Sequence, residues 1–500
     1  MLDKLQNENF IDSTRPGMIG DGIHSGGGRL VTHTSLHRKN SAIETFHTHQ
    51  KILLVIFLIL MGLGIAFYPL QFLIVFISGM SLLYFADLLF NLFLIIKSFQ
   101  KPSEIQILNS EIGKLEDKNL PIYTIFCPLY KEWQVISQFT RAIAAIDWPK
   151  DKLDVQLLLE EDDDETIAEI KKQNLPGYFR MIIVPDGQPK TKPKACNYGL
   201  GHAKGEYAVI FDAEDIPDPD QLKKAYLTFE KLKNDKIICA QAKLNFYNAR
   251  QNILTRLFSA EYALWFDLVL IGLQSIKSPI PLGGTSNHFR TKDLNMLKGW
   301  DPFNVTEDCD LGMRIAKAGY HTVIFNSTTM EEANSKLGNW MRQRSRWIKG
   351  YMQTYLVHMR RPGEFTSDIK NPDILTFQLV VGGKVLAAFI NPAMWIMTIV
   401  YFSFRSTIGP TIASLYPSPV LYIAIFSLVF GNFLYVYYYM IGCAKRGQWD
   451  LVKYVFFVPF YWLLISIASW KALYQLFFKP HFWEKTVHGF HLNPNKNENE

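Results

Sequence analysis

Cysteine is scarce in this chain: five residues are scattered along 500, and none forms a CxxC pair. That spacing excludes a zinc-finger or disulfide framework and suits a reducing cytoplasm. A dense Lys/Arg stripe with interleaved aromatics is also absent, so despite the net charge of +6 we expect no nucleic-acid partner. Residues 1–50 lack the apolar core of a signal peptide. They are polar, with a Gly-rich patch around 20–28, and we predict a disordered cytoplasmic tail.

Long apolar runs are what the chain does contain. Ile52–Tyr68 and Phe72–Ile96 are each long enough, or nearly so, to cross about 30 Å of hydrocarbon as a helix. We therefore assign two transmembrane helices to residues 51–98, and the basic residues on both flanks place those flanks in the cytoplasm. Asp87 lies inside the second run. Because a carboxylate that faces lipid is costly, we expect it to face protein, with structural pairing favoured over a substrate role.

Three further apolar runs lie within residues 374–480, at Leu375–Phe404, Val420–Ile441 and Val452–Phe478. If all three crossed the bilayer, residues 481–500 would lie outside the cell. We predict instead that the last run is re-entrant or interfacial, bent at Pro459, and that the tail 481–500 is cytoplasmic.

Residues 105–365 form one predicted globular domain between these membrane segments. Short apolar strands alternate with helical patterns such as Val135–Ala145, which predicts a parallel α/β sheet with helices on both faces and ligands beyond the carboxyl ends of the strands. The predicted strands are Tyr123–Leu129, Val155–Glu160, Met181–Val184, Tyr207–Phe211, Ile237–Leu244 and Thr322–Phe325. Leu254–Leu273 is apolar but carries Glu261 and Asp267, so we predict an interfacial amphipathic helix there.

The first motif with chemical content follows the strand at Tyr207. This strand ends in Asp212, Glu214 and Asp215, within YAVIFDAEDIPDPD. Carboxylates this close repel one another unless a divalent cation lies among them, and hard oxygen ligands suit Mg²⁺ or Mn²⁺ that also bind phosphate oxygens. A solvated acidic turn would give the same pattern, so both interpretations stay open.

Two more motifs suit a nucleotide. The strand in QLLLEEDDDET runs into Glu160 and Glu161, whose carboxylates could accept hydrogen bonds from a uracil or ribose edge. The same acidic run would also suit a helix N-terminus, where negative charge is favourable. The loop KTKPKACN, residues 190–197, supplies lysines that would neutralise a diphosphate, although a surface loop would have a similar composition.

The last two motifs lie near the end of the domain. In TED, residues 306–308, Asp308 either caps the helix that follows or acts as the base that takes a proton from an attacking acceptor hydroxyl. In NWMRQRSRWIKG, Gln343, Arg346 and Trp347 lie within about one helical turn. The arginine fork suits a diphosphate and the indole face suits a pyranose. An interfacial basic helix with an aromatic anchor would give the same pattern.

Taken together and in this order, the five motifs resemble those of the processive family 2 glycosyltransferases, such as cellulose synthase catalytic subunits and hyaluronan synthases. The DAED, QRSRWIKG and WEKTVHG variants look most similar to bacterial XagB-like exopolysaccharide synthases. The resemblance implies a GT-A (Rossmann-like) α/β domain on the cytoplasmic side of the inner membrane. That domain would be inserted between N- and C-terminal transmembrane helices, with interfacial helices near 254–273 and 339–357.

The resemblance also implies roles for the matching residues. Catalysis is implied for Asp212, Glu307 and Asp308; substrate binding for Glu160, Glu161, Lys194, Asn197, Gln343, Arg346 and Trp347; and Mg²⁺ or Mn²⁺ ligation for Asp212 with Glu214 or Asp215. In WEKTVHG, Lys485-Thr486 and His488-Gly489 match a C-terminal cytoplasmic signature. The chain departs from the family in carrying a Glu-Glu pair at 160–161 and in offering two candidates, Glu214 and Asp215, for the second metal ligand.

The leading hypothesis is an inverting, metal-dependent synthase. It would transfer sugar from a UDP-sugar, with UDP-glucose favoured by the resemblance, to a growing β-linked polysaccharide that is extruded through its transmembrane region. The second hypothesis is a single-addition transferase that acts on a lipid-linked acceptor, and the QxxRW motif weighs against it. The third is a catalytically degenerate membrane receptor. The expected partners are the UDP-sugar, the polysaccharide acceptor and the lipid bilayer, and accessory export subunits are left open.

Overall fold

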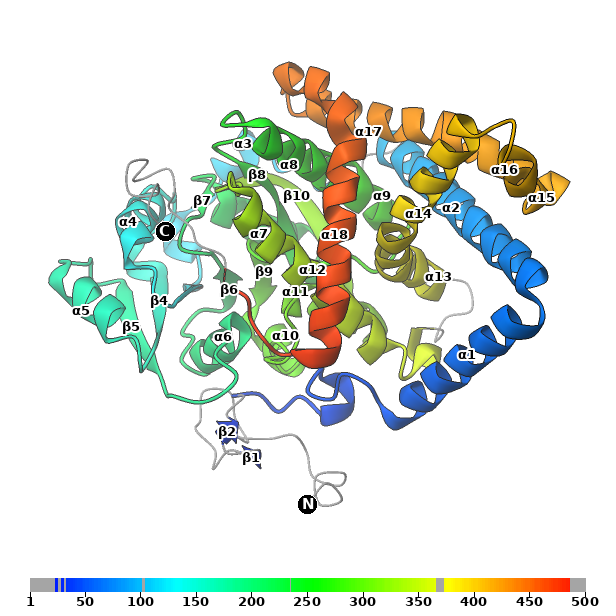
Figure 1. The fold of residues 1–500 in the computed structure, drawn as a ribbon. Helices are drawn as coiled ribbons and strands as arrows, with labels where there is room; N and C mark the ends of the chain where they lie inside the picture. Colours follow the sequence, from blue (N-terminus) through cyan, green and yellow to red (C-terminus); the bar gives the residue numbers. More distant parts are fainter. Residues whose placement is uncertain are drawn as a thin grey trace.

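An eight-stranded sheet lies at the centre of the α/β domain, and the apolar helices lie along one side of that domain (Figure 1). The computed structural model describes residues 23–25, 28–30, 33–100, 104–233, 235–365 and 373–485. The strands lie in the order β5-β4-β3-β6-β9-β8-β10-β7. Their bounds are β3 Tyr123–Leu129, β4 Leu153–Glu160, β5 Phe179–Val184, β6 Tyr207–Ile210, β7 Ile216–Pro217, β8 Ile237–Phe246, β9 Asn287–Arg290 and β10 His321–Glu331. A separate antiparallel pair, β1 (Ile23–Ser25) and β2 (Gly28–Leu30), precedes the domain.

All six predicted strands form close to their expected bounds, but the prediction of a parallel sheet is corrected to a mixed one. β9 lies antiparallel between β6 and β8, and β7 pairs antiparallel with β10 at the edge. Both strands are short and lack an apolar run, so their sequences do not distinguish them from loops. The half of the sheet that carries the first acidic motifs, β5-β4-β3-β6, is parallel throughout.

Helices cover both faces of the sheet because successive strand side chains point to opposite sides. Within β3, Ile125 enters one apolar core and Phe126 enters the other. The helices on the first face are α4 Ile136–Ala144, α5 Asp164–Lys172 and α7 Gln221–Lys231. Those on the second are α6 Lys192–Gly201, α9 Leu270–Ser275, α10 Thr291–Met296 and α11 Glu307–Lys317. This packing brings the first residue of α6 beside Asp212, just past the end of β6.

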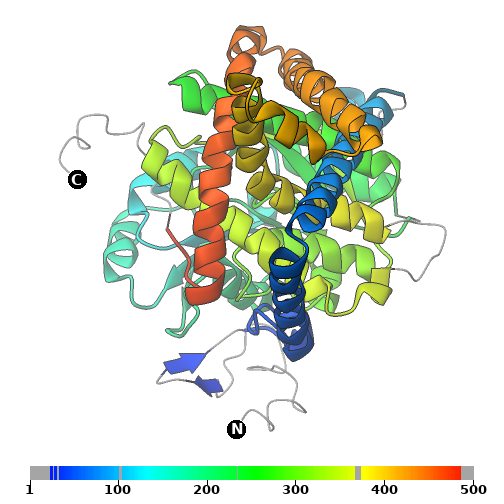
Figure 2. The same ribbon diagram turned by 45° about the vertical axis from the view of Figure 1, so that its right-hand side comes forward.

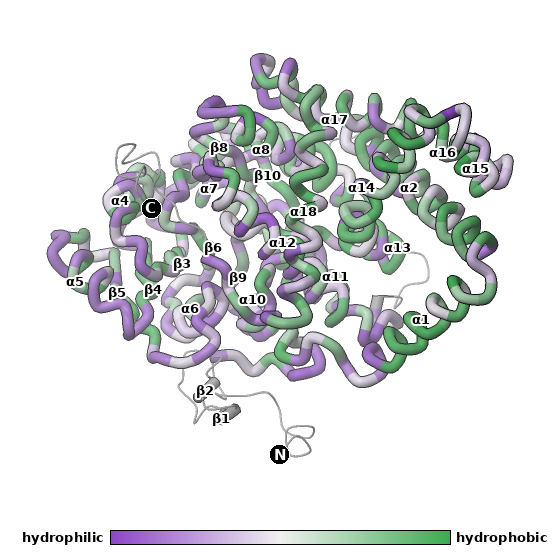
Figure 3. The backbone as a smooth tube through the Cα atoms, in the orientation of Figure 1, coloured by the Kyte–Doolittle hydropathy of each residue, from purple (hydrophilic) through white to green (hydrophobic). Residues whose placement is uncertain are grey.

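The apolar helices gather on the side of the molecule away from the hydrophilic α4 and α5 (Figure 3). Within the described residues, six helical segments are long and apolar enough to cross a membrane. They are α1 Thr48–Phe67; α2 Pro69–Gln100; α8 Ile253–Leu264 continued by α9; α13 Asp373–Phe377 continued by α14 Lys384–Ser403; α16 Ser418–Phe426 continued by α17 Asn432–Lys445; and the 3-10 helix Trp449–Phe457 continued by α18 Val458–Phe478. Two short helices, α3 Asn109–Ile112 and α15 Gly409–Ser414, lie outside these segments.

Both ends of the α1–α2 pair return to the α/β domain. At the start of α1, the Gln50 side-chain amide donates to the carbonyl of Leu356, at 2.7 Å. Near the end of α2, the backbone of Leu94 packs against Gly272 of α9. A pair of helices that crosses a membrane twice has both of its ends on the same side. The two contacts are compatible with that arrangement.

The segment Ile253–Ser275, predicted as an interfacial helix, is enclosed by protein: 72% of its apolar window is buried. Its two carboxylates are paired with arginines. Glu261 accepts hydrogen bonds from Arg344 at 2.9 and 2.6 Å, and Asp267 accepts one from Arg446 at 2.5 Å. The helix therefore joins the domain to α12 (Leu337–His358) and α17 rather than presenting an apolar face to lipid.

Both ends of the last apolar run also contact the α/β domain. At its start, Arg250 holds Asp450 at 2.8 and 2.9 Å. Past its end, the Lys485 ammonium donates to the backbone carbonyls of Tyr130 and Lys131. Between these contacts, α18 lies alongside α12, the second predicted interfacial helix (Figures 1 and 2). Pro459 falls in the first turn of α18, so the chain does not bend within that helix at this proline.

The N-terminal segment departs from the predicted disordered tail over residues 33–50. Asp301 accepts hydrogen bonds from the Ser41 hydroxyl at 2.8 Å and from the Ala42 backbone N–H at 2.6 Å. The Arg360 guanidinium donates to backbone carbonyls of the same segment. Residues 1–22 and 486–500 lie outside the described residues, and with them Thr486, His488 and Gly489 of the C-terminal signature.

Gly272 is the position where α9 meets α2 most closely, because a Cβ there would lie 2.8 Å from the carbonyl carbon of Leu94. We predict that Gly272→Ala destabilises the detergent-solubilised protein by about 1–3 kcal/mol, the usual cost of overpacking, and lowers its Tm. Gly79→Ala on α2 is the matched control, since a Cβ there meets nothing within 4 Å. Equal Tm values for the two variants would contradict this contact.

Candidate active site

One cavity of about 420 Å³ collects most of the predicted site residues. It opens where β6 ends, and it passes between α11 and α12 toward the apolar helices. The predicted residues that line it are Asp212, Glu214, Glu307, Asp308, Gln343, Arg346 and Trp347. Residues from three motifs that are far apart in the sequence therefore line one cavity.

Lys192 is the cation closest to the acidic strand end. Its ammonium donates to an oxygen of Asp212 and, at 2.8 Å, to the backbone carbonyl of Gly284. Burial disfavours its charge, but Asp212 and Glu307 outweigh that effect and raise the pKa of Lys192. A positive charge is thus held among the carboxylates. The family resemblance points to Lys194 of the same KTKPKACN loop, and the sequence of the loop does not show which lysine faces the cavity.

α11 begins at Glu307, so both carboxylates of TED lie in its first turn. The Asp308 carboxylate accepts a hydrogen bond from the Cys309 backbone N–H at 2.7 Å. Burial raises the pKa of Asp308 to about 6. Burial and the adjacent charge of Asp308 raise the pKa of Glu307 to about 8. Both carboxylates of TED thus line the cavity from the first turn of one helix.

α12 places an arginine opposite these carboxylates. Burial lowers the pKa of Arg346, while Glu307 and Asp308 oppose that shift. The guanidinium lies 4.4 Å from the ring of Trp483, and its Nε has no hydrogen-bond partner within the described part of the chain. Trp347 packs toward Tyr262, with ring centroids 6.4 Å apart. Arg346 thus keeps donors for an anion.

The two candidates for the second metal ligand occupy different environments. Glu214 lines the cavity, whereas Asp215 is fully buried behind it. The Asp215 carboxylate accepts hydrogen bonds from the Asp212 backbone N–H, at 2.7 Å, and from the Thr285 hydroxyl. Burial, followed by the charge of Asp212, raises the pKa of Asp215 well above its usual range. One oxygen of Asp215 accepts both hydrogen bonds, and the other is buried with no hydrogen-bond partner among the described residues. Glu214 instead faces the cavity, where a ligand would lie.

The oxygen donors of Asp212 and Glu214 fit Mg²⁺ or Mn²⁺. Among the described residues, no three His, Cys, Asp or Glu side chains are grouped closely enough to form an all-protein metal cage. Mg²⁺ is commonly bound by one or two carboxylates, with water and substrate phosphates completing the shell. Two carboxylates at the mouth of a cavity match that pattern. Glu331, the last residue of β10, also lines the cavity and adds a third acidic group nearby, although it belongs to no recognisable motif.

Four predicted substrate-binding residues lie outside the cavity lining. Glu160 and Lys194 form a buried ion pair at 2.6 Å, and burial raises the pKa of Glu160 to about 7. Asn197 exchanges two hydrogen bonds with the backbone of Trp300, both at 2.9 Å. Glu161 accepts a hydrogen bond from the Asp186 backbone N–H. Their contacts support the strand ends, and nucleotide binding by these four residues stays a prediction.

Comparison with known proteins agrees with this geometry. Residues 121–350 match the family model described as glycosyltransferase like family 2. Over 238 residues the chain is 26% identical to the probable glycosyltransferase YdaM of Bacillus subtilis (strain 168), which covers 47% of this chain and 56% of that protein. Over 259 residues it is 27% identical to the probable glucomannan 4-beta-mannosyltransferase 3 of Arabidopsis thaliana, which covers 50% of this chain and 46% of that protein.

A solved structure shares the fold. The mannosyltransferase PcManGT from Pyrobaculum calidifontis, in complex with GDP-Man and Mn²⁺, aligns with a TM-score of 0.50 at 18% identity, over 81% of this chain and 99% of that one. The chain spans about half the length of the curated relatives that it matches. The matches support a glycosyltransferase.

The different environments of Glu214 and Asp215 predict which carboxylate binds the metal. Glu214→Gln should raise the Mn²⁺ concentration needed for half-maximal turnover by about 10–100-fold, the usual cost of perturbing a metal site. Asp215→Asn should change that concentration less than about twofold, because an amide retains the oxygen that accepts its two hydrogen bonds. The measurement is a Mn²⁺ titration of nucleotide release. The opposite ranking would assign the ligand to Asp215.

Proposed function

We propose that this protein is an integral-membrane, metal-dependent glycosyltransferase that extends a saccharide at its α/β domain and passes it between its apolar helices. The observation that carries the proposal is the continuity of one cavity. At one end it is lined by Asp212, Glu214 and Asp308, and at the other by residues of α2, α14, α17 and α18.

The far end of the cavity suits a saccharide. It is lined by Trp265, Tyr435 and Trp462, whose rings can stack on pyranose faces, and by Asp87 and Lys384, whose charged groups can bond to hydroxyls. Ionisable residues within apolar helices are costly and mark pathways for polar ligands. The Tyr435 hydroxyl donates to Asp87, which bears out the expected structural pairing of that carboxylate. Because Asp87 also lines the cavity, the same pair would contact a passing chain.

The reaction that the domain end supports is displacement at the anomeric carbon. Asp308 takes the proton of the acceptor hydroxyl. The hydroxyl oxygen bonds to the anomeric carbon while the bond from that carbon to the diphosphate breaks on the opposite face. The configuration at the anomeric carbon is therefore inverted. Lys192 and Arg346 hold the diphosphate oxygens, since both cations already lie among the cavity carboxylates. Mg²⁺ or Mn²⁺, when bound at Asp212 and Glu214, stabilises the charge that develops on the leaving diphosphate.

The proposed topology places the α/β domain in the cytoplasm of an inner-membrane protein. α1, α2, α14 and the α16–α17 helix cross the bilayer, and the last apolar run stays on the domain side because both of its ends contact the domain. Basic residues at the domain ends of the crossing helices, such as Lys51, Lys97 and Lys445, agree with this orientation. Nucleotide-sugars are supplied from the same side.

The donor is a nucleotide-sugar, and a direct comparison will identify it. The family resemblance favours UDP-glucose, whereas one relative is named a mannosyltransferase and the solved neighbour holds GDP-Man. The test incubates nanodisc-embedded protein with UDP-glucose, UDP-N-acetylglucosamine or GDP-mannose, each with Mg²⁺, Mn²⁺ or EDTA. We expect one donor to release its nucleotide in a metal-dependent reaction and to yield a ladder of polymer. A single glycolipid product would support the single-addition alternative, and no release from any donor would contradict the proposed activity.

Asp308→Asn tests the catalytic base. We predict at least about a 100-fold fall in nucleotide release, since an amide cannot accept the proton, with Asp235→Asn on the domain surface as the control. In the wild type, the rate should fall as the pH drops through about 6, because protonation of Asp308 removes the base. A variant that keeps its rate, or an acidic limb that Asp308→Asn leaves unchanged, would remove Asp308 from this role.

A further inference from the structure

A second, separate pocket lies at the far ends of the two helices that carry the catalytic groups. Its volume is about 270 Å³, and it shares no lining residue with the larger cavity. It is formed by the N-terminal segment near residue 39, the end of α10, the C-terminal half of α11 and the end of α12. None of the motifs found in the sequence accounts for it.

The pocket is strongly basic. Six cationic side chains line it against one carboxylate, that of Glu364. The cations are Lys39, Lys298, Arg314, Lys317, Arg360 and Arg361. Like charges gathered around one space repel one another, so their arrangement is stable only when anions lie close by. Asp310 pairs with Arg314, and Glu364 pairs with both Lys317 and Arg361. Lys39 and Lys298 form no ion pair within the described part of the chain, so the pocket keeps an excess of positive charge.

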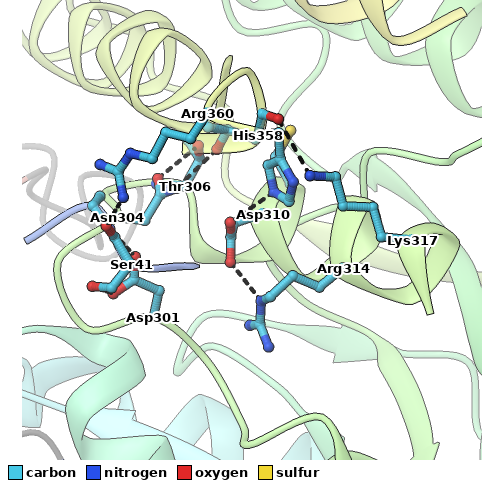
Figure 4. Close-up of polar contacts among 12 residues, drawn as sticks. Ser41, Asp301, Asn304, Thr306, Asp310, Arg314, Lys317, His358 and Arg360 are labelled. Carbon is cyan, nitrogen blue, oxygen red and sulfur yellow. Dashed lines mark hydrogen bonds and ion pairs between the residues drawn. The ribbon is translucent and has the colours of Figure 1, made fainter. Parts of the chain in front are cut away.

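Hydrogen bonds hold two of the arginines, Arg314 and Arg360, in place. Arg314 is held by Asp310 at 2.8 Å and by two backbone carbonyls, so one carboxylate neutralises it (Figure 4). The terminal nitrogens of Arg360 donate to backbone carbonyls alone, which carry no net charge. The Nε of Arg360 is buried and has no hydrogen-bond partner among the described residues. A built and rigid cation thus retains a donor at the pocket.

Burial disfavours the charged forms of two of these cations. It lowers the pKa of Lys317 in spite of the ion pair with Glu364 at 3.2 Å. It also lowers the pKa of Arg360 in spite of Glu44. An anion in the pocket would reverse both shifts by stabilising the charged forms.

We propose that this basic pocket is a second, non-catalytic site for a phosphate group, carried either by an anionic lipid headgroup or by a soluble phosphorylated ligand. Arginine and lysine side chains that converge on one space are the groups that bind phosphate oxygens. The first turn of α1 contacts the last turn of α12 through Gln50 and Leu356, so a headgroup at the start of the first membrane helix lies within reach.

The pocket is placed to act on the catalytic helices. Arg314 and Lys317 belong to α11, whose first turn carries Asp308, and Arg360 follows α12, which carries Arg346. Asp310 already joins the two helices, because it accepts from Arg314 and pairs with His358 at 3.0 Å (Figure 4). The Lys317 ammonium also donates to the His358 carbonyl, at 3.2 Å. A bound phosphate would add a further bridge between the two helices and hold the base and the arginine in register.

The test measures the thermal stability of the full chain in detergent and in nanodiscs. Inorganic phosphate is the soluble probe, with chloride at equal ionic strength as its reference and EDTA present throughout. Phosphatidylglycerol discs are compared with phosphatidylcholine discs as the lipid probe. We expect at least one probe to raise Tm by about 2–4 °C. A response to the lipid alone assigns a headgroup, a response to phosphate alone assigns a soluble ligand, and a response to both assigns the phosphate chemistry itself.

Matched variants locate the response. Lys39→Gln/Lys298→Gln removes two pocket charges without removing a structural hydrogen bond, and should abolish most of the Tm shift. Lys277→Gln/Lys292→Gln removes the same charge elsewhere on the domain and should retain the shift, as should the conservative pair Lys39→Arg/Lys298→Arg. The proposal is overturned if neither probe raises Tm above its reference, or if the pocket variant responds as fully as the surface control.

Discussion

Carboxylates cannot be packed side by side in a partly buried space unless positive charge lies among them. The larger cavity of this protein gathers Asp212, Glu214, Glu307, Asp308 and Glu331. The charges of Lys192 and Arg346 act on this cluster. Burial raises the pKa values of Glu307 and Asp308. The excess of negative charge explains why the site suits a divalent cation with its diphosphate. The chemistry follows from this excess of negative charge, because the same groups that need a metal also include a carboxylate able to accept a proton.

The fold makes the cluster possible by bringing three kinds of element to one place. Asp212 follows the carboxyl end of β6, and Glu307 and Asp308 are the first residues of α11. Arg346 lies on α12 and lines the same cavity. Close packing of α12 on the TED loop depends on Gly350, where a Cβ would lie 2.7 Å from the Cβ of Thr306. The two helices that carry the base and the arginine are also joined by Asp310, in the first turn of α11, which lies 3.0 Å from His358, the last residue of α12. The base and the arginine thus lie on helices, whereas Asp212 and Glu214 lie in the turn that follows β6.

Much of the fold and of the candidate site could be predicted from the sequence, and what the predictions missed has physical causes. Apolar strands that end in charge were predicted correctly, because β3, β4 and β6 are buried on both faces and therefore continuously apolar. β9 was missed because a four-residue antiparallel insertion carries no periodic signal. Lys192 was passed over for Lys194, since only the direction of the first turn of α6 decides which lysine faces the cavity.

The membrane end of the cavity was beyond sequence reasoning for a related reason. Asp87 was expected to face protein, but its partner Tyr435 lies in a helix at the other end of the chain. Only tertiary packing brings α2, α14 and α17 around one space. Likewise, the ordered segment from residue 33 has a polar sequence, and its order comes from hydrogen bonds to Asp301 and Arg360 that no local pattern shows.

The central claim is that one continuous cavity binds the cation-bound diphosphate at one end and the saccharide product at the other. The most direct measurement is a cryo-electron microscopy structure of the protein in nanodiscs with Mn²⁺, a nucleoside diphosphate and an oligosaccharide. The account predicts Mn²⁺ density between Asp212 and Glu214, and saccharide density that runs from Asp308 past Trp265 toward Tyr435. Metal bound away from Asp212, or a saccharide that leaves over the solvent-facing side of the domain, would contradict it.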